Sequence, residues 1–264
     1  MSSDVGGFNM ELTILGSSGS YPGPQSACSS YLVRQDGYHL LLDAGNGSMS
    51  NLFAACSPAK LDAIFISHGH SDHWADLVGI YYYCLFAEQP VNPITLVTSE
   101  AVADLVLKQI GKENFSPVFD LKVIDGGDGF TQGPFRCTIA GTGHSVPTFA
   151  IRVEAQGKGL TYTADTGESS SVEDLAMDTE LLLAECTWRL GHSYSGPPLH
   201  HDPATLAALI LRTNAKKAMV THVAYPNDRL EVADQLRKLV GQCEVLVAKD
   251  TMSISIDADV TPIP

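Results

Sequence analysis

Charged residues are scarce in this chain of 264 residues, because Asp, Glu, Lys and Arg together make up only 17% of it. Cations are the scarcer kind: 16 Lys and Arg stand against 30 Asp and Glu, which gives a net charge of −14 at pH 7. An acidic surface repels polyanions, and non-specific affinity for nucleic acids comes from cationic contacts. The composition therefore favours a small-molecule partner over DNA or RNA.

Paired cysteines and long apolar runs are also missing. None of the six cysteines forms a CxxC pair, and we expect them to be reduced and mostly buried: Cys28, Cys56, Cys84, Cys137, Cys186 and Cys243. No apolar run reaches the roughly 18 residues of a membrane span, and the first ten residues show neither a cationic start nor an apolar run. These absences predict a cytoplasmic protein with no membrane segment.

The chain does contain many short β-rich runs, which alternate with helical patterns. We count about a dozen expected strands and some five helices, among them 74–86, 100–110 and 203–214. Helices that cover the outer faces of two packed sheets would bury every apolar face of such a chain. We expect one α/β domain over residues 1–264, with two half-lobes joined near the Gly-rich stretch at 125–133.

One segment concentrates the candidate chemistry. Three histidines and an aspartate lie within six residues directly after the apolar strand DAIFIS, in the sequence His68-Gly69-His70-Ser71-Asp72-His73. Alternate residues of an extended chain share a face, so His68 and His70 can point to one side. Asp72 and His73 lie where the chain turns into a helix and can face a second point. The spacing therefore suits two adjacent metal ions better than one.

This HxHxDH sequence after an apolar strand resembles the signature of the metallo-β-lactamase superfamily. Later strands supply an isolated histidine, an aspartate and a final histidine in the order that the family implies: His144 in AGTGHSVPTFAIRV, Asp165 in LTYTADTGES and His222 in KAMVTHVAYPND. The runs LTILGSSGS and LLLDAGNG also resemble the opening strands of the family. The resemblance implies a four-layer αββα sandwich of two mixed β-sheets flanked by helices.

The resemblance also implies a division of the ligands between two divalent cations. His68, His70 and His144 would hold one ion, Asp72, His73 and His222 the other, and Asp165 would bridge both. Nitrogen and carboxylate ligands suit zinc, with manganese or iron as alternatives. A water between two such ions loses a proton near neutral pH, and Asp72 would orient the hydroxide.

The second half of the chain resembles the ribonuclease Z-like phosphodiesterases of this superfamily. Three segments show this resemblance: AECTW at 184–188, HHDPATLAALI at 200–210 and MVTHVAYPND at 219–228. Alignment on the paired small residues 207 and 208 makes His201 the expected proton donor to the leaving group, with His200 as the fallback. Glu185 is a candidate to orient His201.

The gap between His144 and Asp165 leaves room for two strands and a turn, whereas RNA-processing members usually carry a long basic arm. We therefore expect a small phosphodiester substrate, such as a cyclic nucleotide. A thioesterase or lactonase, a ribonuclease that processes tRNA 3′ ends, and a non-enzymatic scaffold with a degenerate site are the alternatives. Relatives are often dimers, so the resemblance also makes a homodimer possible.

Overall fold

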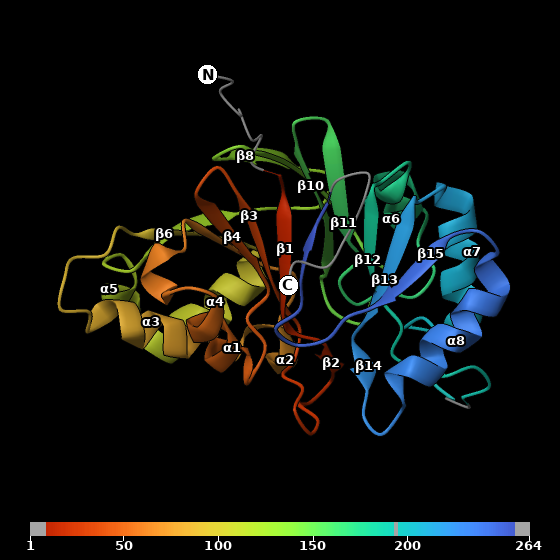
Figure 1. The fold of residues 1–264 in the computed structure, drawn as a ribbon. Coiled ribbons are helices and arrows are strands. Elements are labelled where there is room, and N and C mark those ends of the chain that lie inside the picture. Colours follow the sequence, from red (N-terminus) through yellow and green to blue (C-terminus); the bar gives the residue numbers. More distant parts are fainter. Residues whose placement is uncertain (1–8, 193–194, 257–264) are drawn as a thin grey trace, which may run out of the picture.

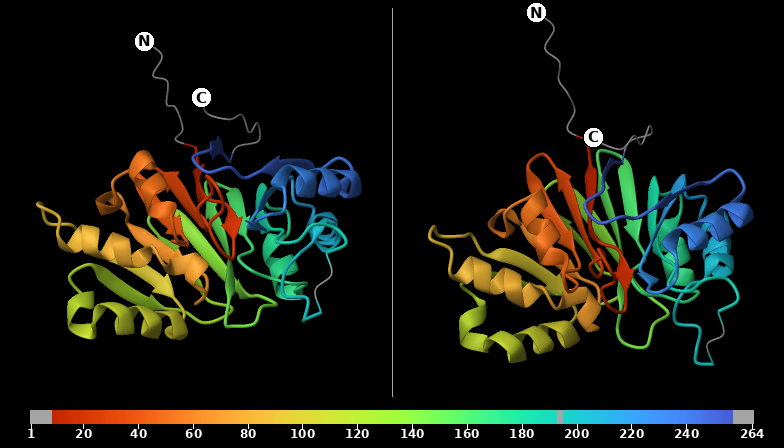
Figure 2. Two further views of the ribbon diagram at one scale, coloured as in Figure 1. Left: turned by 90° about the horizontal axis from the view of Figure 1, so that it is seen from below. Right: turned by 60° about the horizontal axis from the view of Figure 1, so that its bottom comes forward.

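Two β-sheets of seven strands each pack face to face, and helices cover the outer face of each sheet (Figures 1 and 2). The computed structural model describes residues 9–192 and 195–256. The layers run helix, sheet, sheet, helix, which confirms the predicted αββα sandwich. Both sheets are mixed, with parallel and antiparallel neighbours.

The first sheet has the strand order β16-β1-β3-β4-β5-β6-β7. Its strands are β1 (Glu11–Gly16), β3 (Ser30–Gln35), β4 (Tyr38–Leu42), β5 (Ala63–Ile66), β6 (Ile94–Thr98), β7 (Phe119–Val123) and β16 (Ser253–Ser255). Strands β4 to β7 are parallel, and β1 is antiparallel to β3 and β16. The helical segments of this half are α1 (Ser48–Ala55), a 3₁₀ turn (Pro58–Lys60), α2 (Ser71–Trp74), α3 (Leu77–Leu85), α4 (Glu100–Ile110) and α5 (Lys112–Phe115).

The second sheet has the order β15-β13-β12-β11-β10-β9-β8. Its strands are β8 (Gly129–Gln132), β9 (Phe135–Gly141), β10 (Phe149–Ala155), β11 (Lys158–Tyr162), β12 (Leu181–Glu185), β13 (Lys217–Thr221) and β15 (Glu244–Val247). Strands β11, β12, β13 and β15 are parallel. The helices on this half are α6 (Ser170–Ala176), α7 (Pro203–Thr213) and α8 (Arg229–Val240). Two short strands, β2 (Ser18–Gly19) and β14 (Val223–Ala224), pair with each other outside both sheets.

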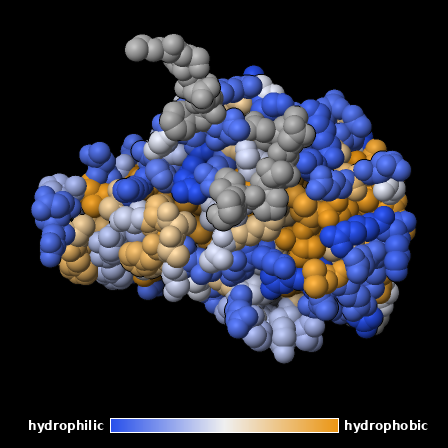
Figure 3. Space-filling view, viewed as in Figure 1, coloured by the Kyte–Doolittle hydropathy of each residue, from blue (hydrophilic) through white to orange (hydrophobic). Residues whose placement is uncertain are grey.

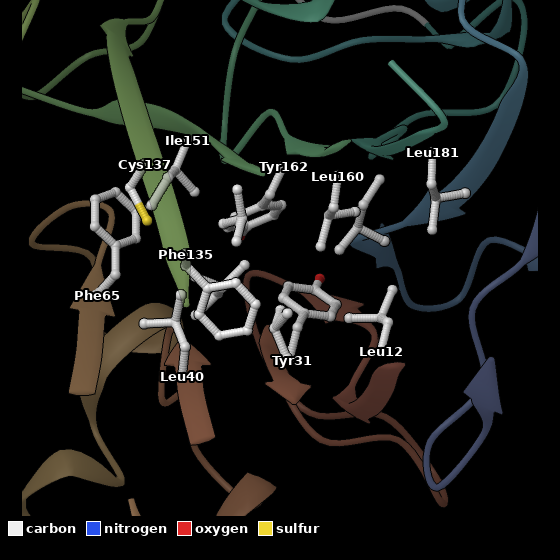
Figure 4. Close-up of a cluster of buried hydrophobic side chains, with 14 of the residues drawn as sticks. Leu12, Tyr31, Leu40, Phe65, Phe135, Cys137, Ile151, Leu160, Tyr162 and Leu181 are labelled. Carbon is white, nitrogen blue, oxygen red and sulfur yellow. The ribbon is translucent and has the colours of Figure 1, made fainter. Parts of the chain in front are cut away.

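Apolar side chains from both sheets fill the space between them (Figure 4). Tyr31 and Leu40 of the first sheet meet Phe135, Leu160 and Tyr162 of the second (Figure 4). The rings of Tyr31 and Tyr162 lie 4.9 Å apart between centroids. Two further clusters lie between each sheet and its own helices. Apolar residues on both faces explain why β5 and β12 are buried along their whole length.

The helix expected over 74–86 is two helices in the structure, α2 and α3. The break falls at Asp76, whose backbone N–H donates to the carbonyl of Ala44 at 2.9 Å and not to the preceding helical turn. The Asp76 carboxylate accepts a second bond, from the backbone N–H of Met49, at 2.8 Å. Two bonds to the segment after β4 thus bend the chain immediately beyond α2.

Helix α7 begins where the sequence predicts. Asp202 caps it by accepting hydrogen bonds from the backbone N–H groups of Ala204 and Thr205, and Pro203 holds the first helical position. The hydroxyl of Thr205 accepts in return from the backbone N–H of Asp202, at 3.1 Å. The start of α7 fixes the residues that precede it, which belong to the site.

Loops from both halves gather at one edge of the sandwich, near α2, β2 and β14 at the bottom of Figure 1. This edge carries the carboxyl ends of the parallel strands β5, β11, β12 and β13. Hydrophilic residues cover much of the surface seen in Figure 3, with apolar residues gathered in patches over both halves. Within the described ranges, no helix has both the length and the apolar character needed to cross a bilayer.

Candidate metal centre

The seven residues expected as metal ligands all lie at this edge. His68, His70, Asp72 and His73 follow β5, and α2 carries the last two. The other three follow strands of the second sheet: His144 comes after β9, Asp165 after β11 and His222 after β13. The fold thus brings together side chains from both sheets, and they form two overlapping groups.

The first group consists of His68, His70, His144 and Asp165. Its ring nitrogens converge: His70 Nδ1 lies 3.2 Å from His68 Nε2 and 3.1 Å from His144 Nε2. Asp165 Oδ2 lies 3.7 Å from His68 Nε2 and 3.9 Å from His144 Nε2. Four ligand atoms therefore face one point.

The second group consists of Asp72, His73, His222 and again Asp165. Nε2 of His73 and Nε2 of His222 lie 3.3 Å apart. Each of these nitrogens is 3.2 Å from Asp165 Oδ1. Asp165 therefore directs one carboxylate oxygen to each group, which is the arrangement of a bridging ligand.

The residues present fit two divalent cations. Asp165 Oδ1 is buried, and no hydrogen bond satisfies it among the described residues, although two imidazole nitrogens lie 3.2 Å away. A buried carboxylate oxygen without a hydrogen bond is costly unless something else compensates its charge. Three imidazoles and a carboxylate, or two imidazoles and two carboxylates, are donor sets that zinc and related ions accept.

The buried carboxylate of Asp43, the residue that follows β4, fixes the His73 ring. Asp43 Oδ2 lies 2.7 Å from His73 Nδ1 and accepts hydrogen bonds from the hydroxyls of Ser67 and Tyr162, each at 2.8 Å. Its other oxygen accepts from the backbone N–H of Ser67 at 2.7 Å. Asp43 accepts the hydrogen bond of the His73 Nδ1–H group, so Nε2 is the nitrogen that is directed toward the second group and can bind a cation there.

Other ligands are also oriented from behind. The hydroxyl of Thr187 lies 2.9 Å from His222 Nδ1, and the hydroxyl of Ser67 lies 3.0 Å from His68 Nδ1. Asp72 Oδ2 accepts the backbone N–H of Ser20 at 2.8 Å. These hydrogen bonds fix the planes of the imidazole rings before a cation binds.

Burial and neighbouring charges determine which of these groups are ionised. Burial lowers the pKa of His68 well below its ordinary value, and nearby His73 acts in the same direction. Burial also opposes a charge on His73, but Asp165 and Asp43 raise its pKa well above the ordinary value. Burial would raise the pKa of Asp165, yet His222 and His73 outweigh it and hold that pKa well below the usual range. Asp165 is therefore an anion, as a bridging ligand must be.

His201, the expected proton donor, is not beside the other seven residues. It is buried, and its Nδ1 lies 3.0 Å from the hydroxyl of Thr205 in the first turn of α7. A local partner on α7 therefore holds the His201 ring, and the role of His201 as proton donor stays a prediction.

His200 occupies the expected place instead. Its ring centroid lies 5.1 Å from that of His144 and 5.8 Å from that of His222. Glu185 Oε1 lies 2.8 Å from His200 Nδ1, so this carboxylate orients His200 and not His201. Burial would lower the pKa of His200, but Glu185 raises it to about 9.

Sequence reasoning missed the orienting roles of Ser67 and Tyr162. Ser67 directly precedes His68, and this position next to the histidine-rich segment is a weak signal that it contacts a histidine. Tyr162 reads as an ordinary core residue at the end of β11, and only the packing of the two sheets brings its hydroxyl to Asp43. Thr187 belongs to the AECTW run and could have been found there as a partner for a histidine.

Comparisons with known proteins agree with this geometry. Residues 38–223 match the family model of the beta-lactamase superfamily domain. The chain is 29% identical over 248 residues to the probable metallo-hydrolase YhfI of Bacillus subtilis, covering 91% of this chain and 97% of YhfI. It is 25% identical over 301 residues to a ribonuclease Z of Methanothermobacter thermautotrophicus, covering 94% of this chain and 97% of that protein.

Solved structures show the same fold. The crystal structure of YhfI, described as a metallo-beta-lactamase fold protein, superposes with a TM-score of 0.84 at 23% identity, covering 93% of this chain and 98% of YhfI. The short form of human tRNase Z gives a TM-score of 0.74 at 22% identity, covering 94% of this chain and all of that one. The chain therefore belongs to the beta-lactamase superfamily, as a metal-dependent hydrolase with the metallo-β-lactamase fold.

Proposed function

We propose that this protein hydrolyses a small phosphodiester, using two divalent cations held by His68, His70, Asp72, His73, His144, Asp165 and His222. Zinc is the first candidate for both ions, with manganese or iron as alternatives. The observation that carries the proposal is the pair of His200 and Glu185 beside the two ligand groups. A phosphodiester needs a proton donor for its leaving alkoxide, and this pair supplies one.

Asp72 has a second task besides binding a cation. Its Oδ2 accepts the backbone N–H of Ser20 and lies 3.3 Å from His222 Nε2. Among the described residues no hydrogen bond engages Oδ1. This oxygen can accept a hydrogen bond from a water molecule and so aim the water at phosphorus. When bound, the two cations supply an activated water and stabilise charge on the phosphoryl oxygens.

His200 is suited to protonate the leaving oxygen. Glu185 is completely buried, and its two oxygens accept hydrogen bonds from the backbone N–H groups of Thr166 and Thr187 as well as from His200. The carboxylate is therefore rigid, and it fixes the Nδ1 side of the imidazole. Nε2 is left to donate a proton, and general-acid catalysis of this kind contributes about 10²–10⁴-fold.

Two features favour a small substrate over a large RNA. The chain between His144 and Asp165 forms β10 and β11 with short turns, so no arm extends from this part of the fold. Among the described residues, no lysine or arginine pairs with the seven ligands or with Glu185, and the net charge is −14. An RNA chain would need cationic contacts along its backbone.

The test is a substrate panel with the protein loaded with zinc or with manganese. We expect turnover of bis-p-nitrophenyl phosphate and of a cyclic mononucleotide, but not of thioesters or lactones. Protein that carries both ions yet cleaves neither phosphodiester would refute the proposal. Turnover of thioesters or lactones alone would assign the site to acyl substrates.

The matched pair His200→Ala and His201→Ala sharpens the test. Loss of the donor in His200→Ala is expected to lower kcat on a cyclic nucleotide by about 10²-fold or more. His201→Ala removes a neighbour that faces α7, so its kcat should remain close to that of the wild type. Metal content and circular dichroism must be unchanged in both variants. Equal losses in the two variants would contradict the assignment of His200.

A further inference from the structure

Two ligands of the second group are in contact with a turn that belongs to neither sheet. This 17–27 turn lies between β1 and β3 and includes β2. The backbone N–H of Ser20 in the turn donates to Asp72 Oδ2 at 2.8 Å. Strand β2 pairs in parallel with β14, which directly follows His222 (Figure 1). The 17–27 turn therefore reaches one ligand from each half of the molecule.

The approach of the turn to His222 is close. A Cβ atom on Gly19 would lie 2.5 Å from the carbonyl oxygen of His222 and 2.6 Å from its Nδ1. His222 has a positive φ of 54°, and Ser20 has a positive φ of 61°. Residues with side chains adopt this conformation only where their surroundings hold them in it. The position of the turn and the position of the ligand therefore depend on each other.

Asp250 holds both ends of the 17–27 turn. Its Oδ1 accepts a hydrogen bond from the hydroxyl of Ser17 at 2.8 Å, and its Oδ2 accepts one from the backbone N–H of Ala27 at 2.7 Å. Oδ2 also accepts from Asn51 Nδ2 of α1, at 3.1 Å. The Ser17 hydroxyl in turn accepts from Arg229 Nη1 at the start of α8, at 2.9 Å. One carboxylate thus ties the first and last residues of the turn to both halves of the protein.

The chain around Asp250 is itself fixed to both sheets. Asp250 lies where the chain crosses from β15 of the second sheet to β16 of the first. On one side of it the backbone N–H of Ala248 donates to the carbonyl of Val220 at 2.9 Å, and on the other side the N–H of Thr251 donates to the carbonyl of Ile14 at 2.7 Å. Within the described ranges, no hydrogen bond or ion pair joins Asp250 to any of the seven ligands. Its influence on the cations must therefore pass through the turn.

We propose that Asp250 is a positioning residue of the metal centre: it fixes the 17–27 turn, and the turn places Asp72 and His222 for the cation of the second group. The proposal rests on the two cations of the proposed function and not on the choice of substrate. Among the described residues, no hydrogen bond joins the turn to the three histidines of the first group. The effect of Asp250 is therefore confined to one of the two cations.

The test is the affinity of each cation, measured without substrate by competition with a chromophoric zinc chelator. Asp250→Ala should weaken one zinc constant by about ten-fold or more and leave the other close to its wild-type value. His222→Ala lacks a ligand of the second group, so the constant that it lowers most identifies that group. The two variants should lower the same constant.

Asp250→Asn separates hydrogen bonding from charge. Its amide oxygen can accept from Ala27, and its NH₂ group can donate to the hydroxyl of Ser17, which rotates to suit it. Asp250→Asn should therefore keep most of the zinc affinity that Asp250→Ala loses. Ser17→Ala removes one bond of the same network and should lower the same constant by a smaller factor, which keeps the test open if Asp250→Ala folds poorly.

Asp62→Ala is the matched control. Asp62 Oδ2 also accepts a backbone N–H, that of His39, at 2.8 Å, but Asp62 precedes β5 and so lies at the opposite end of this strand from His68. Its loss should lower the free energy of unfolding and leave both zinc constants unchanged. Gly19→Ala tests the last step separately, because the added Cβ atom would displace His222, and it should weaken the same constant as Asp250→Ala.

No loss of zinc affinity in Asp250→Ala, or equal losses at both groups, would overturn this role of Asp250. A loss in Asp250→Asn as large as that in Asp250→Ala would also overturn it, because the hydrogen bonds would then not be its cause. A wild-type protein that binds fewer than two zinc ions is a different result, which would refute the metal centre of the proposed function and this role with it. Failure to cleave phosphodiesters with both ions bound would refute the proposed reaction and leave the role of Asp250 intact.

Discussion

Replacement of Asp43 by asparagine tests whether the metal centre depends on the residues behind it. Asp43 is fully buried and accepts four hydrogen bonds, from Ser67 N, Ser67 Oγ, His73 and Tyr162. Asparagine has almost the same shape, but one oxygen becomes an NH₂ donor. The hydroxyls of Ser67 and Tyr162 can rotate to suit it. The backbone N–H of Ser67 and the Nδ1–H group of His73 are fixed donors and cannot rotate to accept from the new NH₂ group.

Either orientation of the new amide disturbs the hydrogen bonds that Asp43 makes with Ser67 and His73. If the amide oxygen faces the Ser67 N–H, the NH₂ group meets His73 Nδ1 at the position where the distance is now 2.7 Å. The imidazole must then carry its proton on Nε2, the atom that faces Asp165 and His222. If the amide is turned, NH₂ opposes the fixed Ser67 N–H, also at 2.7 Å. A hydrogen bond to a charged group contributes about 1.5–3 kcal/mol, which is the expected loss.

We therefore expect Asp43→Asn to weaken zinc binding at the group that contains His73 by about 10- to 100-fold, the usual effect of removing an orienting partner. Competition with a chromophoric zinc chelator measures this constant. Tyr162→Phe is the control, because it removes a donor to the same Asp43 oxygen but leaves the contact with His73. It should lower the free energy of unfolding with little change in zinc affinity. Wild-type affinity for both ions in Asp43→Asn would refute the reasoning.

Two further predictions concern the close contact between Gly45 and the histidine-rich segment 68–73, and the ion pair between Glu180 and Lys216. A Cβ atom on Gly45 would lie 2.1 Å from the carbonyl oxygen of Asp72, so Gly45→Ala should lower the amount of metal bound per chain. Gly141→Ala is the control, because nothing lies within 4 Å of the added Cβ atom, and it should leave the metal content unchanged. Elemental analysis after dialysis measures the metal content of both variants. Burial would raise the pKa of Glu180, but Lys216, at 2.7 Å, outweighs it and lowers that pKa. A carboxyl group whose pKa is lower in the folded state stabilises the fold at every pH above its pKa in the unfolded chain, about 4.5 for Glu180. This stabilisation is lost as the pH falls below that value and through the lower pKa of the folded state. Urea unfolding should therefore show Glu180→Gln to be less stable than the wild type at pH 7, with a difference that narrows below pH 4.5; a difference that does not depend on pH would contradict the ion-pair explanation.

The seven clustered residues were predicted from two kinds of signal, the local HxHxDH spacing and the resemblance to the metallo-β-lactamase superfamily. His68, His70, Asp72 and His73 are close together in the chain, and the apolar strand before them shows which end of the sheet they occupy. The later ligands stand alone, but Asp165 and His222 also follow apolar strands, and strand ends of a parallel sheet meet at one edge. Spacing alone therefore indicated only the first four residues, and the resemblance to the metallo-β-lactamase superfamily supplied His144, Asp165 and His222.

The orienting residues carry no comparable signal. Tyr162 lies in a strand whose last four residues are buried, so its hydroxyl is indistinguishable in the sequence from that of any core tyrosine. Its contact with Asp43 joins positions 119 residues apart and crosses from one sheet to the other. Such a contact depends on how the two sheets are rotated and spaced, which no pattern within one strand encodes.

The adjacent histidines show a different limit. His200 and His201 have different neighbours in the structure: the ring of His200 lies beside those of His144 and His222, and the ring of His201 lies beside the hydroxyl of Thr205. Alignment on the small residues of α7 favoured His201, whereas His200 is the histidine that pairs with Glu185 and lies beside His144 and His222. The residues around the helix start contain the better signal: Asp202 caps α7, and Thr205 in its first turn presents a hydroxyl to the residue before the cap. A histidine at that position has a hydrogen-bond partner on its own helix and is buried against it. Its neighbour His200 has no such partner on α7 among the described residues and pairs with Glu185 instead.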